Sequence, residues 1–347
     1  MAIPEKLYTQ IREAIEGAAR PLIFFDDDPD GLSSYLILKK HYGKGKGIPM
    51  RRNDENIQEY VQNVEAYGPD LVITLDKATI TQDFVDQIKV PMIIVDHHAP
   101  NQIQGALYLN PQIYDKKDNR PTSYWSWQIT KEDPKTAWIA AIGITGDYHL
   151  LDAHFLKTFA YPELYGTPKN PNEALFEQPI GTLVKIFICT LKGKTADLQR
   201  YLSYLENIND PNEILQQTTP EGKKIWQKYE RIIKEYDGLL TLALKSEDDG
   251  TLFIFKCPAV ETSFTSPLSN EILYRVKSKY IIIARSTNDR IMMSLRSKAE
   301  PIRPVLLKIL PQLPGAYGGG HDMACGANIP ASEYDHFITL IKKELYT

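Results

Sequence analysis

The chain has 347 residues, of which 43% are apolar and 24% charged, as expected for a globular protein large enough for two cores. A formal net charge of −4 excludes a generally basic nucleic-acid coat, so a polyanion would have to bind at a local patch. The cysteines Cys189, Cys257 and Cys325 are widely separated, which excludes a zinc ribbon or a disulfide framework and favours a reducing compartment. A charged N-terminus and short apolar windows predict a soluble, cytoplasmic protein without a membrane partner.

Helical and strand-like patterns alternate along the first hundred residues. The predicted elements are helices at 5–19, 32–41, 57–66 and 80–88 and buried strands at 22–25, 71–75 and 92–95. Such alternation predicts an α/β domain with a parallel sheet that helices cover on both faces. In that architecture, ligands bind beyond the carboxyl ends of the strands.

The pattern changes after an apolar helix predicted at 134–146. Residues 170–236 carry successive helical stretches without a convincing strand, which predicts a helical connector. Strand-like runs then return, so a second, smaller α/β domain is expected. Its predicted elements are strands at 239–244, 252–256, 280–284 and 290–295 and helices at 268–276, 304–309 and 332–346.

An acidic run directly follows the first predicted strand. Asp26, Asp28 and Asp30 occupy every second position, so an extended segment would place their carboxylates on one side. Three like charges so placed repel one another unless cations intervene. Taken alone, the run is equally consistent with a solvated turn or a helix N-cap.

Further carboxylates and imidazoles follow later elements, namely Asp76, the run Asp96-His97-His98, and Asp147. Each alone is also compatible with a helix cap or a surface histidine pair, but neighbouring imidazoles at a strand end supply nitrogen ligands that a carboxylate can orient. Oxygen ligands dominate and no thiolate takes part, which favours manganese or magnesium over a structural zinc. Two such ions sharing a carboxylate would polarise a phosphate and activate water, so phosphoester hydrolysis is the leading hypothesis.

The order of these motifs resembles the four motifs of the DHH phosphoesterase superfamily. The run Gly318-Gly319-Gly320-His321 resembles the glycine-rich signature of the DHH-associated domain, and the five signatures together resemble the RecJ-like nuclease branch, including its archaeal members. The resemblance implies a DHH catalytic domain at 1–168, a helical connector at 169–237 and a DHH-associated substrate-binding domain at 238–347. It also implies a catalytic cleft between the two α/β domains.

The resemblance further implies roles for single residues. The implied metal ligands are Asp28, with Asp26 as a weaker contributor, for one manganese ion and Asp30, His97 and Asp147 for a second. Asp76 would bridge both ions, for which magnesium is an alternative, and His98 would lie near the scissile phosphate. The substrate phosphate would be bound by the amides of Gly318 to Gly320, the ring of His321 and the guanidinium of Arg296. On their own, such glycines would indicate a flexible loop and such an arginine a solvated strand end.

These implications predict a manganese-dependent phosphodiesterase that acts as a single-strand-specific exonuclease on DNA, RNA or both by two-metal hydrolysis. A hydrolase of short linear or cyclic oligonucleotides is an alternative. A non-enzymatic replisome subunit is another, although retention of Asp28, Asp30, Asp76, His97, His98 and Asp147 argues against it. The expected partners are single-stranded nucleic acid and proteins of replication or repair.

Overall fold

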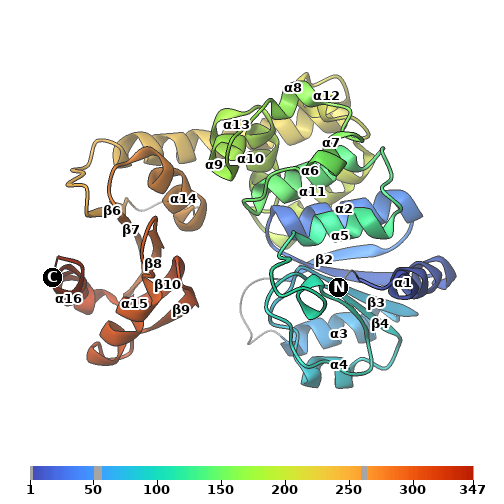
Figure 1. Ribbon diagram of the computed structural model, residues 1–347, viewed down its shortest axis with the longest axis horizontal. Coiled ribbons are helices and arrows are strands. Elements are labelled where there is room, and N and C mark those ends of the chain that lie inside the picture. The colour runs from blue at the N-terminus through green and yellow to red at the C-terminus, as the bar shows by residue number, and fades with distance from the viewer. Residues whose placement is uncertain (1–2, 51–56, 259–263, 347) are drawn as a thin grey trace. The chain divides into compact units, whose positions relative to one another are not determined.

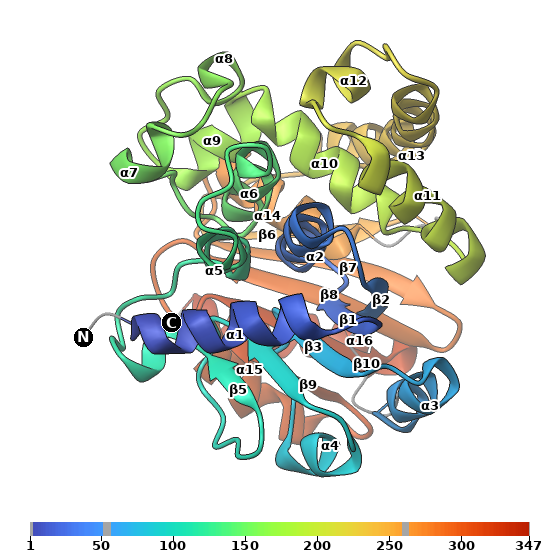
Figure 2. The same ribbon diagram turned by 90° about the vertical axis from the view of Figure 1, so that its right-hand side faces the viewer.

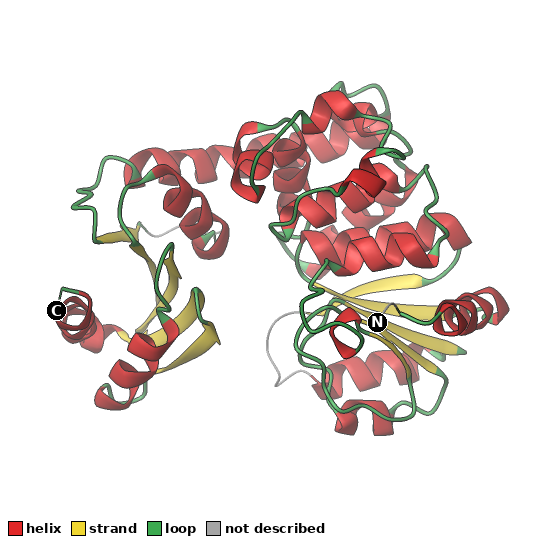
Figure 3. Cartoon of the chain, viewed as in Figure 1, coloured by secondary structure: helices red, strands yellow, loops and turns green. Residues whose placement is uncertain are grey.

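The computed structural model describes residues 3–50, 57–258 and 264–346, and the chain divides into two compact units, Met1–Tyr229 and Glu230–Thr347. Each unit contains its own sheet with helices packed on it (Figure 3). The predicted α/β class, with a parallel sheet in the N-terminal half, is therefore confirmed. Within the described residues, no helix is long and apolar enough to cross a membrane.

The first unit is built on a five-stranded sheet in the order β2-β1-β3-β4-β5, in which all neighbouring strands are parallel. Its strands are β1 (Pro21–Asp26), β2 (Lys46–Met50), β3 (Leu71–Leu75), β4 (Met92–Val95) and β5 (Leu107–Leu109). The three central strands were predicted from their apolar runs. The two edge strands were missed, because β2 contains a glycine and a proline and β5 has three residues, so neither carries a clear apolar pattern.

Helices cover both faces of this sheet, because alternate residues of each central strand point to opposite sides. In β1, Ile23 and Phe25 belong to the core beneath α1, α2, α5 and α6, whereas Leu22 and Phe24 belong to the core beneath α3 and α4 (Figures 1 and 2). The bounds of these helices are Glu5–Gly17 for α1, Pro29–Tyr42 for α2, Ile57–Tyr67 for α3, Gln82–Gln87 for α4, Thr122–Ile129 for α5 and Ala137–Gly146 for α6. This double cover explains why the central strands read as continuous apolar runs.

Seven helices follow within the described residues, and those from α9 onward fall in the predicted connector. They are α7 (Ala153–Leu156), α8 (Pro162–Tyr165), α9 (Pro171–Glu177), α10 (Ile180–Thr190), α11 (Thr195–Asn207), α12 (Pro211–Leu215) and α13 (Pro220–Ala243). α10 packs against α6 and α2, so helices of the predicted connector belong to the first unit up to Tyr229. The three-part division at 168 and 237 stays a proposal.

The strand predicted at 239–244 is wrong, because α13 continues to Ala243. Leu239 and Ala243 are buried together with Ile232 and Tyr236, and these four positions recur every three or four residues. That period is helical, so the local leucine-rich composition misled the prediction.

The second unit contains a mixed sheet in the order β6-β7-β8-β10-β9, in which β6 and β7 are parallel and the remaining pairs antiparallel. Its elements are β6 (Leu252–Cys257), α14 (Thr265–Arg275), β7 (Tyr280–Thr287), β8 (Arg290–Ser297), α15 (Arg303–Ile309), β9 (Tyr317–His321), β10 (Ala324–Pro330) and α16 (Tyr334–Leu345). A core that includes Leu295, Leu306 and Phe337 lies between the sheet and α15 and α16. β9 was missed because its three successive glycines leave too few side chains to show a period of two. β10 was missed although Cys325, Ala327 and Ile329 alternate toward the core, because cysteine and alanine form only a weak apolar pattern.

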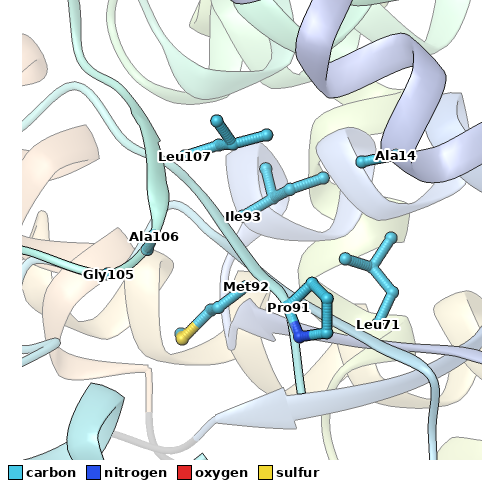
Figure 4. Close-up of a pocket in the computed structure, with 8 residues that line it drawn as sticks. All are labelled: Ala14, Leu71, Pro91, Met92, Ile93, Gly105, Ala106 and Leu107. Atoms are coloured by element: carbon cyan, nitrogen blue, oxygen red, sulfur yellow. The ribbon is translucent and has the colours of Figure 1, made fainter.

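An apolar pocket of about 310 Å³ lies at the amino ends of β3, β4 and β5 (Figure 4). It is lined by Ala14, Leu71, Pro91, Met92, Ile93, Gly105, Ala106 and Leu107. No charged side chain is among these lining residues. The acidic residues follow the carboxyl ends of the same strands, so this pocket is not where their chemistry takes place.

Candidate metal centre

Five of the predicted residues converge at the carboxyl edge of the first sheet. Asp30, His97 and Asp147 each provide one side-chain oxygen or nitrogen atom, and these three atoms lie within 4.8 Å of one another. The same holds for Asp76, His97 and His98. His97 belongs to both groups and therefore links them. The residues come from the ends of β3 and β4, the first turn of α2 and the C-cap of α6.

Asp76 lies at the centre of this arrangement and is 2% exposed. Its backbone N–H donates to the carbonyl of Val95 at 2.9 Å, which ties the end of β3 to the end of β4. Its φ angle of 60° is in the left-handed region, which aspartate and asparagine tolerate better than most residues. The turn directs the carboxylate back over the edge of the sheet, where Oδ1 lies 3.4 Å from Nε2 of His97.

The first turn of α5 holds two of the carboxylates. The backbone N–H groups of Thr122 and Ser123 donate to the two oxygens of Asp30 at 2.7 and 2.9 Å, and the hydroxyl of Thr122 donates to Oδ1 of Asp76 at 3.0 Å. The N-cap residue of α5, Pro121, makes no side-chain cap. Asp30 therefore caps this helix from α2 by accepting from two of its N-terminal backbone N–H groups.

The ring of His97 is fixed in one tautomer. Its Nδ1 lies 2.9 Å from the backbone carbonyl of Asn119, and a carbonyl only accepts, so Nδ1 carries the proton. In the neutral ring, the lone pair is then on Nε2, which lies 3.4 Å from Asp76 and 3.6 Å from Asp147. This is the tautomer that a metal ligand requires.

His98 is oriented by a carboxylate. Its Nδ1 lies 2.8 Å from Oδ1 of the buried Asp96, whose second oxygen is 3.5 Å from the side-chain amide of Asn110. Burial alone would lower the pKa of His98, but the hydrogen bond to Asp96 and the charges of Asp96 and Asp28 raise it above its usual value. With Nδ1 bound to Asp96, Nε2 is the nitrogen through which His98 can exchange a proton with a substrate.

The carboxylates create an unfavourable field in the absence of a cation. Burial, followed by the charges of Asp30, Asp28 and other nearby carboxylates, raises the pKa of Asp76 well above its usual value. Burial and the charges of Asp30 and Asp28 likewise raise the pKa of Asp147. A divalent cation would relieve both effects, and a donor set of carboxylates with one or two imidazoles and no thiolate fits manganese or magnesium.

Asp26 and Asp28, predicted as ligands of a first ion, belong to neither group. Oδ1 of Asp26 accepts from Nζ of Lys77 at 2.6 Å, and both side chains are largely buried, with 13% and 7% exposed. Oδ1 of Asp28 caps α2 by accepting from the backbone N–H of Gly31 at 3.0 Å. A side chain at position 31 would lie 2.5 Å from the carbonyl oxygen of Asp26, so the turn requires glycine. The ligand role of both aspartates stays a prediction.

The predicted phosphate-binding residues lie in the second unit. Gly318 to Gly320 and His321 form β9, an edge strand paired with β10, so the alternative of a flexible loop is wrong. Arg296 on β8 donates to Oδ1 of Asn270 at 2.6 Å and to the hydroxyl of Ser266 at 2.9 Å. These contacts hold the guanidinium at a defined place on the sheet.

Thr122 was not predicted, and its substitution tests how strongly α5 positions the carboxylates. Thr122→Val keeps the shape but removes the donor to Asp76, and we expect it to weaken Mn²⁺ binding by about 10-fold or more, the usual effect of losing a partner of a metal ligand. Thr122→Ser keeps the hydroxyl and is expected to bind Mn²⁺ like the parent protein. Calorimetric titration of both variants with Mn²⁺ measures the difference. Equal affinities for the valine and serine variants would show that the hydroxyl does not position Asp76.

Several known protein structures have a fold similar to that of this chain. RecJ from Thermus thermophilus in complex with Mn²⁺ has a TM-score of 0.71 at 16% sequence identity, and the match covers 100% of this chain and 55% of that chain. The chain therefore spans about half of the Thermus protein. A second structure, of exonuclease RecJ bound to manganese, has a TM-score of 0.66 at 16% identity and covers 99% of this chain and 95% of that chain.

A pGpG-specific phosphodiesterase from Vibrio cholerae is a more distant structural relative, with a TM-score of 0.50 at 14% identity over 94% of this chain and 99% of that chain. No curated protein matches the chain in sequence. Two family models do match, the N-terminal domain of the DHH family at residues 20–144 and the DHHA1 domain at residues 249–347. The chain therefore belongs to the DHH family of metal-dependent hydrolases, and its two units have the fold of RecJ.

Proposed function

We propose that this DHH-family phosphoesterase is a RecJ-like exonuclease that removes nucleotides from single-stranded DNA, RNA or both. The observation that carries the proposal is the pair of ligand groups that share His97 beside the buried Asp76. Two linked groups of this kind suit two divalent cations, and we propose Mn²⁺, with Mg²⁺ as an alternative. The RecJ structures with bound manganese support this choice of metal.

Bound divalent cations would polarise the phosphate and lower the pKa of the attacking water. The residues of the chain would then act in three ways. Asp76 would lie between the two cations, and α5 would keep its carboxylate in place through the hydroxyl of Thr122. His98, with a raised pKa and its Nδ1 held by Asp96, would donate a proton from Nε2 to the leaving oxygen.

In the second unit, we propose that the guanidinium of Arg296, the ring of His321 and the backbone of Gly318 to Gly320 bind a substrate phosphate. A guanidinium can bind a phosphate through two parallel hydrogen bonds. The glycines allow a ligand to approach the strand closely, since a Cβ at Gly319 would meet nothing within 4 Å. The cleft between the two domains, the domain bounds and a cytoplasmic location stay proposals.

The proposal is tested by timed digestion of end-labelled single-stranded DNA and RNA, with the label at either end, in Mn²⁺, in Mg²⁺ and in chelator. Stepwise release of mononucleotides from one end, dependent on the metal, is the expected result. Digestion of duplex DNA under the same conditions serves as the control for strand specificity. Metal-dependent cleavage in the interior of the strand, or no cleavage of either polymer, would contradict an exonuclease.

Hydrolysis of short linear or cyclic oligonucleotides is the second candidate function. The resemblance in fold to the pGpG-specific phosphodiesterase, which covers nearly all of both chains, favours it. Comparing kcat/KM on a dinucleotide with kcat/KM on a long single strand separates the two functions. A replisome subunit without catalysis is disfavoured, because the chain brings Asp30, Asp76, His97, His98 and Asp147 together, although replication or repair partners remain compatible with an active enzyme.

A further inference from the structure

On one face of the second sheet, one row of residues across β8, β10 and β9 carries no large side chain. Alternate residues of β8, β10 and β9 lie on the face opposite to the α15 and α16 core, and the strand register arranges them in rows. The rows are Arg296–Ala324–His321, Ser294–Gly326–Gly319 and Met292–Asn328–Tyr317. The middle row is made of two glycines and a serine. A polymer could therefore lie directly on the backbone of these strands, between the two outer rows.

The charge of this face suits an anion. Arg290 and Arg296 of β8 lie on it, together with His321 of β9, and Arg285 of β7 continues the row that contains Met292. No aspartate or glutamate occupies a position on this face in the described residues of β6 to β10. The whole chain has a net charge of −4, so this local excess of cations provides the kind of patch that a polyanion needs.

Tyr317 is exposed on this face and nevertheless fixed. It is 62% exposed, but its hydroxyl accepts a hydrogen bond from Nδ2 of Asn328 at 2.7 Å, and Cζ of Arg290 lies 5.2 Å from its ring centroid. Arg290 is itself held by hydrogen bonds to the carbonyls of Gly315 and Asn328 at 2.8 and 3.1 Å. A ring already held in one orientation loses little entropy when a ligand binds to it.

We propose that Tyr317 stacks on a base of a single-stranded substrate whose backbone lies along β9. Gly319 and Tyr317 are two residues apart on the same side of the strand, a separation of about 7 Å. This is about the distance from the phosphate to the base within one nucleotide, so a phosphate at Gly319 places its base over Tyr317. Open sheet faces with exposed aromatic rings bind single strands in this way. The inference rests on the proposed function, since it assigns a base to the same substrate.

The first test is binding without catalysis, with a short fluorescein-labelled single strand in chelator and anisotropy as the readout. Tyr317→Ala should weaken binding on the order of 10-fold, which is typical of losing one base–aromatic stack. Tyr317→Phe keeps the ring and loses only the hydrogen bond from Asn328, so it should weaken binding much less than Tyr317→Ala. Tyr346→Ala removes a tyrosine that is 51% exposed just after α16 and is the matched control. Thermal unfolding of each variant checks that the fold is retained.

A second test asks whether Tyr317 contacts a base rather than the backbone. Strands with one abasic site, moved through each position, should reveal a position at which the parent protein loses about as much affinity as Tyr317→Ala loses on the intact strand. At that position, Tyr317→Ala should lose nothing further. Additive losses at every position, or unchanged binding by Tyr317→Ala, would overturn the stacking role while leaving the exonuclease intact. A parent protein that neither binds nor cleaves single strands would instead overturn the proposed function.

Discussion

Asp76→Asn will reduce turnover by at least about 10³-fold, because the substitution removes the charge of the residue proposed to lie between two cations. The backbone should not change, since asparagine accepts a φ angle of 60° as readily as aspartate does. The side-chain oxygen can still accept from the hydroxyl of Thr122. The loss should therefore come from metal binding and not from unfolding.

Two measurements separate these causes. Initial rates on a single strand in saturating Mn²⁺ give the loss of turnover, and thermal unfolding in chelator gives the stability of the metal-free protein. The metal-free variant should be at least as stable as the parent, because a buried charge with a raised pKa has been removed. Asp86→Asn, at an exposed position on α4, is the control. Retention of more than about a tenth of the turnover by Asp76→Asn would end the two-cation role.

Removal of the divalent metal will destabilise the protein, and the destabilisation will increase with pH. Asp76 and Asp147 have raised pKa values in the folded protein, whereas an unfolded aspartate titrates near about 3.9. Between these values the folded state binds more protons than the unfolded state. The free energy of unfolding of the metal-free protein therefore falls as pH rises from about 4 through the raised pKa values, and it stays low above them.

Bound Mn²⁺ reverses this trend, because it requires the deprotonated carboxylates and displaces their protons. At a free concentration of 100 times Kd, one bound ion would add about 2.7 kcal/mol to the free energy of unfolding. Thermal unfolding in Mn²⁺ and in chelator, at several pH values from about 5 to 8, measures the effect. In the parent, we expect the difference in Tm between Mn²⁺ and chelator to widen as pH rises. In Asp76→Asn, we expect this difference to be smaller than in the parent. A difference that is constant with pH would show that these carboxylates are not the ligands.

The sequence predicted the three central strands of the first sheet, β6, β7 and β8 of the second sheet, and most of the long helices. These elements are buried on one side or on both, so their apolar residues keep a regular period. The predictions failed where side chains carry little information. The edge strand β2 has a glycine and a proline, and β9 has three successive glycines. The end of α13 was misread because a leucine-rich run has no local feature that distinguishes helix from strand.

The clustering of the candidate site residues was predictable, but the contacts that hold them in place were not. Asp76 and His97 could be recognised because a parallel sheet gathers residues that follow neighbouring strands. Thr122 and Lys77 could not, since their partners Asp76 and Asp26 are contacts of the folded chain that no spacing or period in the sequence expresses. Pro121 before Thr122 is typical of a helix start but was not used as one. A helix start at a residue that cannot provide a side-chain cap was the available signal for a distant carboxylate.

Asp30 is hydrogen-bonded to α5, a helix that contains two tryptophans whose fluorescence can be measured. Trp125 and Trp127 lie in this helix and are 4% and 0% exposed, and Nε1 of Trp125 donates to the carbonyl of Arg120 in the loop before it. A cation that binds Asp30 would draw on the same oxygens that hold the amide groups of Thr122 and Ser123. We therefore expect cation binding at Asp30 to change the environment of the two indoles, and intrinsic fluorescence during titration with Mn²⁺ tests this without a label.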